Sequence, residues 1–373
     1  MTANTLGPYI EIESLEDLPE AVEGKVCHYA FQYVDFEAVP DYVGCTHFQD
    51  CLFLGCKVPQ SMFRHLRSDC LVFPRMGMSY KAFVNCLYNG WSLYEGYDWK
   101  NDTGYGDCFD GRIYNEFVKN GKRADDIRED LARTIHDHGI TDAMFDFLVG
   151  YNEKDVVAVM GGHAMKRTDE SYLKVVRISK ALTEKGKLMV SGGGPGAMEA
   201  THLGAWMAGR TEEELQDALT ILSESPSFRD GRWMQTAFMV MDRYPQQKYH
   251  SLGVPTWVYG HEPATPFATD IAKYFNNSLR EDRILEIAKG GIIYSPGAAG
   301  TLQEIFQDGA QNHYETFGYA SPMAFLGYDF FMNEVPVYPF LKDLQSKGRY
   351  DHLLLSISDD CDEVIETIMS FKP

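Results

Sequence analysis

Two glycine-rich turns in this chain have the composition of phosphate-binding turns. The first, residues 191–196 (SGGGPG), follows an apolar stretch at 188–190 and precedes good helix formers at 197–200. The second, residues 295–300 (SPGAAG), follows the apolar stretch 291–294 and also opens a helical pattern. Glycine lets the backbone approach a ligand closely, and the free amides at the start of a helix attract anions. Two such turns in one chain predict a site for a phosphorylated small molecule.

A carboxylate just after the second turn suggests what chemistry this site performs. Glu304 follows Thr301 by three residues, so both side chains face the same side of the predicted helix. A carboxylate beside a bound nucleotide suits cleavage of a glycosidic bond, because it stabilises an oxocarbenium-like transition state or activates water. The alternative for Glu304 is a residue that complements the helix macrodipole. Glu199, after the first turn, either binds ribose hydroxyls or caps its helix.

Arginines and a third glycine turn complete the set of candidates. Arg283, or else Arg280, lies in the helical segment before the second turn and could reach the phosphate or the leaving base; the alternative is an exposed arginine paired with a neighbouring acid. Lys166 and Arg167 either add positive charge or lie on the solvated surface. The third turn, residues 161–163 (GGH), lacks the G-x-G-x-x-G spacing, and no acidic residue closes the next strand. A mononucleotide therefore fits better than a dinucleotide.

Apolar strands that alternate with helices predict the elements that hold these turns. The expected strands are 156–160, 188–190, 256–259, 291–294 and 323–326, with helical patterns between them. This alternation is typical of an α/β fold, which we expect to be a Rossmann-like, doubly wound parallel sheet with helices on both faces. Ligands bind such sheets at the carboxyl ends of the strands, where all three glycine turns fall.

The chain divides into three predicted parts: an aromatic- and Cys-rich β-containing domain at 1–120, a helical connector at 121–150 and the nucleotide-binding domain at 151–373. Val43, Phe48, Phe53 and Val58 recur every five residues, as in a pentapeptide-type β-coil. A small, irregular β-rich domain is the favoured alternative. The connector is expected to break at Gly139. His136 and His138, two residues apart, would face different sides of a helix, so we expect no metal site there.

The composition of the chain disfavours nucleic acids and membranes as partners. The chain has 373 residues and a net charge of −20, which disfavours nucleic acid as the main partner. An acidic, polar N-terminus and the lack of a long apolar run predict a cytoplasmic protein that does not enter membranes.

The two long motifs together resemble those of the LOG family, long mislabelled as lysine decarboxylases. Residues 192–199 (GGGPGAME) and 296–304 (PGAAGTLQE) carry this resemblance. Residues 161–163, 262–263 and 281–283 look closer still to the pyrimidine/purine nucleotide 5′-monophosphate nucleosidases of that superfamily. The family's second glycine in its second motif is Ala298 here, and an alanine methyl would hinder a close approach or a positive φ.

The resemblance implies a site and an activity. Glu304 and Arg283 match the catalytic residues, and the expected substrate-binding positions are Gly161, Gly162, His163, Gly192, Gly193, Gly194, Gly196, Glu199, Pro296, Gly297, Gly300 and Thr301. The implied reaction is hydrolysis of a nucleoside 5′-monophosphate to free base and ribose 5-phosphate, without a metal or organic cofactor, in a homodimer or homotetramer. The alternative is a non-catalytic nucleotide-binding or cofactor-carrier protein on the same fold. No lysine stands in a context suited to a pyridoxal phosphate Schiff base, which disfavours a decarboxylase.

Overall fold

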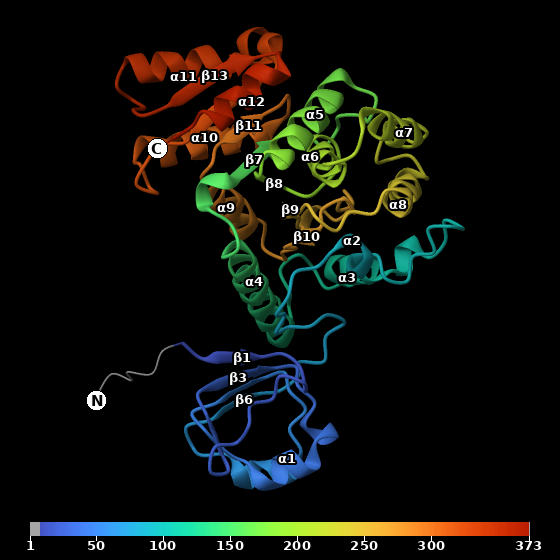
Figure 1. Ribbon diagram of the computed structural model, residues 1–373, viewed down its shortest axis with the longest axis vertical. Coiled ribbons are helices and arrows are strands. Elements are labelled where there is room, and N and C mark those ends of the chain that lie inside the picture. Colours follow the sequence, from blue (N-terminus) through green and yellow to red (C-terminus); the bar gives the residue numbers. More distant parts are fainter. Residues whose placement is uncertain (1–7, 373) are drawn as a thin grey trace. The chain divides into compact units, whose positions relative to one another are not determined.

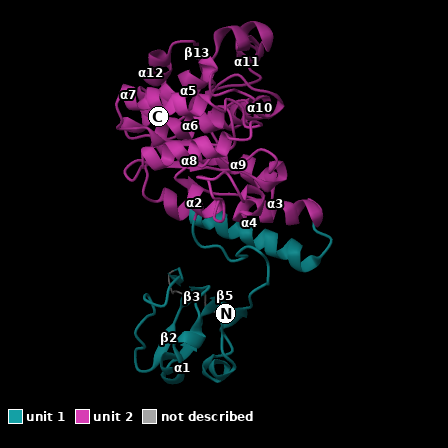
Figure 2. Ribbon diagram, turned by 90° about the vertical axis from the view of Figure 1, so that its right-hand side faces the viewer, with its two compact units in different colours: residues 1–86, 123–143 teal, residues 87–122, 144–373 magenta. Residues whose placement is uncertain are grey.

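The computed structural model describes residues 8–372, and the chain forms two compact units (Figure 2). One unit comprises Met1–Cys86 and Arg123–Ala143, and the other comprises Leu87–Lys122 and Met144–Pro373. The observed division therefore differs from the predicted one, because residues 87–122 fold with the α/β unit. The reason is long-range packing: Tyr94 and Tyr97 join the core that contains Phe238, and the Tyr94 hydroxyl donates to Ala264 O at 2.6 Å.

The first unit contains a coil of short parallel strands. The four-stranded sheet has the order β1-β3-β5-β6, and β2 pairs with β4 beside it. Pairing places Phe31 opposite Phe53 and Val26 opposite Phe48, and all four side chains are buried. Of the four residues in the predicted five-residue repeat, Phe48 and Phe53 are buried on the parallel strands β4 and β5, whereas Val43 lies in a short helix and Val58 lies outside the strands. The strands are β1 (Ile10–Ile12), β2 (Lys25–Cys27), β3 (Tyr29–Gln32), β4 (His47–Gln49), β5 (Leu52–Leu54) and β6 (Leu71–Phe73), with the short helix α1 (Pro40–Cys45) between β3 and β4.

The predicted helical connector is one continuous helix, α4 (Ile127–Leu148). The expected break at Gly139 is wrong. A Cβ at this position would overlap the carbonyl oxygen of Val84, so glycine here permits close backbone packing rather than ending the helix.

The second unit is built on a seven-stranded parallel sheet, which confirms the mixed α/β class (Figure 1). Its order is β10-β9-β8-β7-β11-β12-β13. The expected strand at 256–259 is wrong, because Trp257–Tyr259 form a 3₁₀ turn. The strands are β7 (Val156–Met160), β8 (Leu188–Ser191), β9 (Ser251–Gly253), β10 (Asp270–Ile271), β11 (Ile292–Tyr294), β12 (Pro322–Leu326) and β13 (Leu354–Ser358).

The connections of this sheet reverse direction between β7 and β11. From β7 the chain runs through a helix to β8 on one side, and from β11 through another helix to β12 on the other side. Open α/β sheets bind ligands at this switch point, at the carboxyl ends of the strands. Helix α5 contacts both α6 and α12, α7 contacts α8, and α9 contacts α10. Their bounds are α2 (Gly90–Leu93), α3 (Phe109–Lys119), α5 (Glu170–Glu184), α6 (Ala197–Trp206), α7 (Glu212–Ser223), α8 (Trp233–Arg243), α9 (Asn277–Ile287), α10 (Ala299–His313), α11 (Val337–Ser346) and α12 (Cys361–Met369).

Within residues 8–372, no helix combines the length and the apolar character that a bilayer crossing requires.

Candidate functional site

The three glycine turns meet at the carboxyl edge of the sheet. Gly162, after β7, donates its N–H to Pro296 O at 3.0 Å and accepts the N–H of Ala197 at 3.1 Å. A Cβ at Gly161 would overlap Ser295 Oγ, and one at Gly196 would overlap Gly162 O. Gly196 also has φ +70°, which favours glycine. These positions therefore need glycine so that the three turns can touch.

The first turn, Gly192–Gly196, is buried and closed by the protein's own atoms. The N–H of Gly193 donates to Ser191 Oγ at 3.1 Å, and the N–H of Gly194 points at Met198 Sδ at 3.4 Å. A Cβ at Gly192 or Gly194 would lie 2.8 Å from the Met198 thioether. The open hollow that we expected in this turn is filled by the side chain of Met198.

The second turn, by contrast, opens to solvent. Ala298 is the residue that precedes α10, and its φ is −113°, so alanine adopts this conformation without strain. Among the described residues, no acceptor binds the amides of Ala299, Gly300 and Thr301. A Cβ at Gly300 would meet nothing within 4 Å. The start of α10 is therefore an accessible set of donors with the positive end of a helix dipole.

A cavity of about 450 Å³ lies beside this turn. Gly162 and His163 line it from the end of β7, and Pro296, Gly297 and Ala298 line it from the end of β11. The cavity thus occupies the switch point between these two strands. His163 Nε2 lies 3.5 Å from a carboxylate oxygen of Glu262, which orients the ring at the edge of the site.

Glu304 lies one helical turn after Thr301 and is partly exposed. No hydrogen-bond partner of its carboxylate is found among the described residues. Burial raises the pKa of Glu304 to about 7, the Arg280 cation opposes this rise, and the Glu281 carboxylate adds to it. A carboxyl group with this pKa exchanges protons near neutral pH, as a general acid or base must.

The arginine whose charge acts on Glu304 is Arg280, whereas Arg283, the expected residue, contacts other side chains. Arg280 Nη1 lies 3.3 Å from the position of an added Cβ on Gly192, and Nη2 donates to Asn277 Oδ1 at 3.0 Å. Arg283 instead pairs with Glu286 and lies 5.8 Å from the centre of the Phe145 ring. Both arginines belong to α9, but three residues advance the helix by about 4.5 Å, which takes Arg283 away from the strand ends.

Glu199 points into the core rather than towards a ligand. Arg167 Nε donates to its Oε2 at 3.0 Å, and the Tyr172 hydroxyl donates to the same oxygen at 3.1 Å. Arg167 also donates to Thr236 Oγ1 at 2.8 Å and to Trp233 O at 3.1 Å. Both charged side chains are buried. Both oxygens of the Glu199 carboxylate are therefore already occupied by Arg167 and Tyr172.

Two buried side chains near the glycine turns, His202 and Asp308, were not predicted from the sequence. His202, on α6, lies between Ser191 Oγ (2.8 Å) and Ser251 Oγ (2.9 Å), and burial lowers its pKa to about 3. Asp308 accepts the Tyr294 hydroxyl at 2.7 Å, and burial raises its pKa to about 7. The spacing of Asp308, four residues after Glu304 on one helix face, was the signal available in the sequence.

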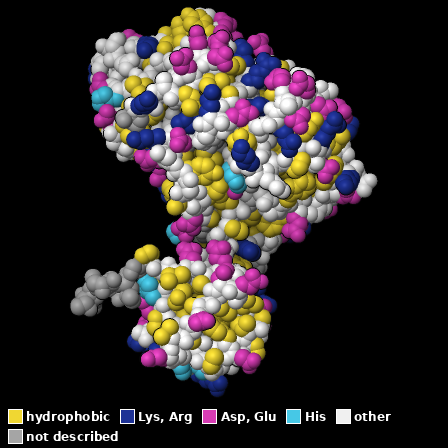
Figure 3. Space-filling view, viewed as in Figure 1, with side chains coloured by type: hydrophobic (Ala, Val, Ile, Leu, Met, Phe, Trp, Pro, Cys, Tyr) yellow, Lys and Arg dark blue, Asp and Glu magenta, His cyan; other side chains and the backbone are white. Residues whose placement is uncertain are grey.

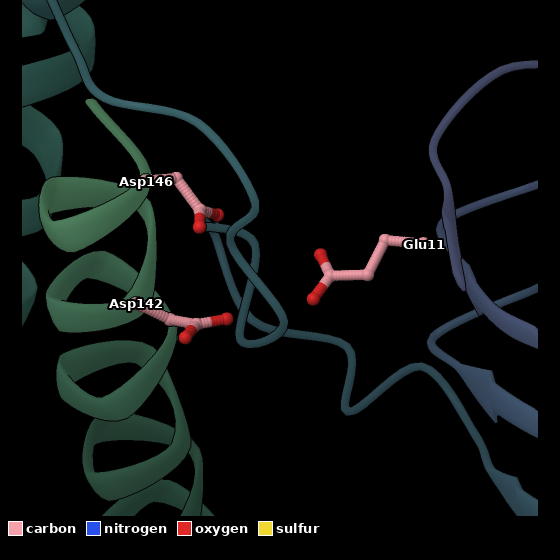
Figure 4. Close-up of side chains that lie close together, drawn as sticks. All are labelled: Glu11, Asp142 and Asp146. Carbon is pink, nitrogen blue, oxygen red and sulfur yellow. The ribbon is translucent and has the colours of Figure 1, made fainter. Parts of the chain in front are cut away.

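Exposed carboxylates occur away from this edge as well. Figure 4 shows Asp142 and Asp146 on successive turns of α4, together with Glu11 of β1. Glu11 and Asp142 belong to one unit and Asp146 to the other.

No family model matches this chain, and no curated protein matches it. One similar solved structure is the molybdenum cofactor binding protein from the phototrophic bacterium Rippkaea orientalis, with 13% identity, a TM-score of 0.35, and coverage of 57% of this chain and 96% of that one. Another is the Chlamydomonas rheinhardtii Moco carrier protein, with 15% identity, a TM-score of 0.35, and coverage of 58% and 95%.

Proposed function

We propose that the switch point between β7 and β11 binds a nucleoside 5′-monophosphate and that Glu304 promotes hydrolysis of its N-glycosidic bond. The phosphate would accept hydrogen bonds from the free amides at the start of α10 and from Thr301. Water would attack C1′, the base would leave, and ribose 5-phosphate would remain. This is the activity that the resemblance to the LOG-family nucleosidases implies.

The observation that best supports this proposal is the position and the raised pKa of Glu304. Glu304 is a partly exposed carboxylate with a pKa of about 7, and it follows the free amides of α10 by one helical turn. An ionised carboxylate there would stabilise the positive charge that develops on the ribose ring. Arg280, whose cation acts on Glu304, is the candidate for contact with the phosphate or the leaving base.

Release of free base from a panel of nucleoside 5′-monophosphates tests this proposal. We expect Glu304→Gln to lower the rate by roughly 100-fold or more, because positioned acid–base groups contribute on this scale. Glu286→Gln, on α9, is the matched control and should retain the rate. Arg280→Ala should weaken activity, whereas Arg283→Ala should not. No base release by the wild type, or equal rates for Glu304→Gln and Glu286→Gln, would reject the enzyme.

The closed first turn supports a second candidate, a carrier that binds a phosphorylated ligand without turnover. The Met198 thioether fills the space over Gly192 and Gly194, so only one of the two expected cradles is open. A carrier must bind its phosphorylated ligand, but it does not need a second set of hydrogen-bond donors to position C1′ for reaction. Ligand-dependent thermal stabilisation without base release supports this candidate. Met198→Ala should then strengthen binding, because it frees the amide of Gly194.

A further inference from the structure

Basic side chains line up on one face of the coil in the first unit. Lys25 of β2 pairs in register with His47 of β4. A parallel bridge between Phe48 and Leu66 places His65 opposite His47 on the next turn of the coil. Residues in register on parallel strands point the same way and stand about 4.8 Å apart. Because the adjacent Val26 and Phe48 are buried, this row of three side chains faces outwards.

A cavity of about 230 Å³ lies over this row. Arg64 and Arg67 line it together with Lys25, His47 and His65, and its eight lining residues include no carboxylate. The rings of His47 and His65 have centroids 5.0 Å apart. Arg64 Nε donates to His65 Nε2 at 3.0 Å, which holds both side chains at the wall.

The positive charge of this cavity is only partly neutralised. Within residues 8–372, neither Lys25 nor Arg64 has a carboxylate oxygen within ion-pair distance, and Arg67 pairs with Asp69 at 3.3 Å. The whole chain carries 54 acidic against 34 Lys and Arg residues, and acidic side chains spread over both units on the face drawn in Figure 3. Burial, followed by the charges of Arg64 and His47, lowers the pKa of His65. A local excess of positive charge on so acidic a protein indicates an anion site.

We propose that this cavity of the coil binds the phosphate group of a small phosphorylated molecule. Lysine and arginine donate charge-assisted hydrogen bonds to phosphate oxygens, and an arginine fork can hold two of them. The cavity volume suits one or two phosphate groups. A nucleic acid is disfavoured, because the net charge of −20 would repel a long polyanion. This site uses none of the residues around Glu304, so it stands apart from the function proposed above.

Calorimetric titration of the full chain with inorganic phosphate and pyrophosphate, at constant ionic strength, tests the site. We expect saturable binding of pyrophosphate that weakens about tenfold in Arg64→Gln and in Lys25→Gln, the effect of one lost charge-assisted hydrogen bond. Lys57→Gln is the matched control, because it removes one positive charge from the same unit, where Lys57 pairs with Asp35. Its affinity should stay within about twofold of the wild type.

A second variant separates this site from the one at α10. If Thr301→Ala abolishes pyrophosphate binding and Arg64→Gln leaves it unchanged, the ligand binds the α/β unit and the proposal is overturned. Equal weakening by Arg64→Gln and Lys57→Gln would also overturn it, because only general charge would then matter. Shifts of the His47 and His65 imidazole NMR signals on titration would support it. Unchanged signals at saturating pyrophosphate would contradict it.

Discussion

Replacing Arg167 by methionine should leave the Glu199 carboxylate buried in the core without its cationic partner. The wild-type guanidinium donates to both Glu199 oxygens and to Thr236 and Trp233, and both charged side chains are about 1% exposed. Breaking a buried ion pair in this way costs about 3–5 kcal/mol of unfolding free energy. The double variant Arg167→Met/Glu199→Gln removes both charges and still leaves an acceptor for the Tyr172 hydroxyl. We therefore expect it to recover about 2 kcal/mol relative to the single variant.

Urea unfolding followed by tryptophan fluorescence measures this effect. All five tryptophans lie in the α/β unit, and the Trp233 ring centre lies 4.7 Å from the Arg167 guanidinium carbon. Base release or ligand binding by a folded double variant would also check that Glu199 makes no substrate contact. A change of less than about 1 kcal/mol in the unfolding free energy of Arg167→Met would contradict this prediction. A double variant less stable than the single one would contradict it as well.

The remaining predictions concern pH and the turns. Asp308 is buried, and its pKa rises from 3.8 to about 7 on folding, so the folded state binds the proton more tightly. The protonated Asp308 carboxyl therefore contributes to the unfolding free energy below pH about 4, and this contribution falls by up to about 4 kcal/mol as the pH rises to 7. Unfolding free energies measured over this pH range should show the fall in the wild type and less of it in Asp308→Asn. If ionised Glu304 is the active form, base release should increase through pH 7; a flat profile would contradict this. Gly196→Ala should lower the unfolding free energy by more than about 2 kcal/mol, because of its positive φ and the nearby Gly162 carbonyl, whereas Gly300→Ala should change it by less than about 1 kcal/mol; similar melting temperatures for the two variants would count against the argument.

Local patterns in the sequence predicted the parts of the fold that depend on neighbouring residues. The apolar runs at 156–160 and 291–294 fall on adjacent parallel strands, and the glycine turns that follow them meet at one edge. Burial on both faces of a parallel sheet requires such runs, so the sequence records them directly. The five-residue spacing of Phe48 and Phe53 likewise reflects the turns of the coil.

Contacts between distant segments decided the rest. Periodicity does not distinguish Arg280 from Arg283 on α9, and only the packing of this helix against the strand ends places Arg280 beside Glu304. The same holds for Met198, which fills the first turn, and for Glu199, which pairs with Arg167 from another segment of the chain. Residues 87–120 looked like part of the N-terminal domain, yet Tyr94 and Tyr97 are buried against Phe238 of α8. The sequence by itself determined the strands at 156–160, 188–190, 291–294 and 323–326, the glycine turns and the position of Glu304 in its helix, because these depend on local backbone preferences. Which side chains surround the site was decided by tertiary packing, because the partners are far apart in the chain.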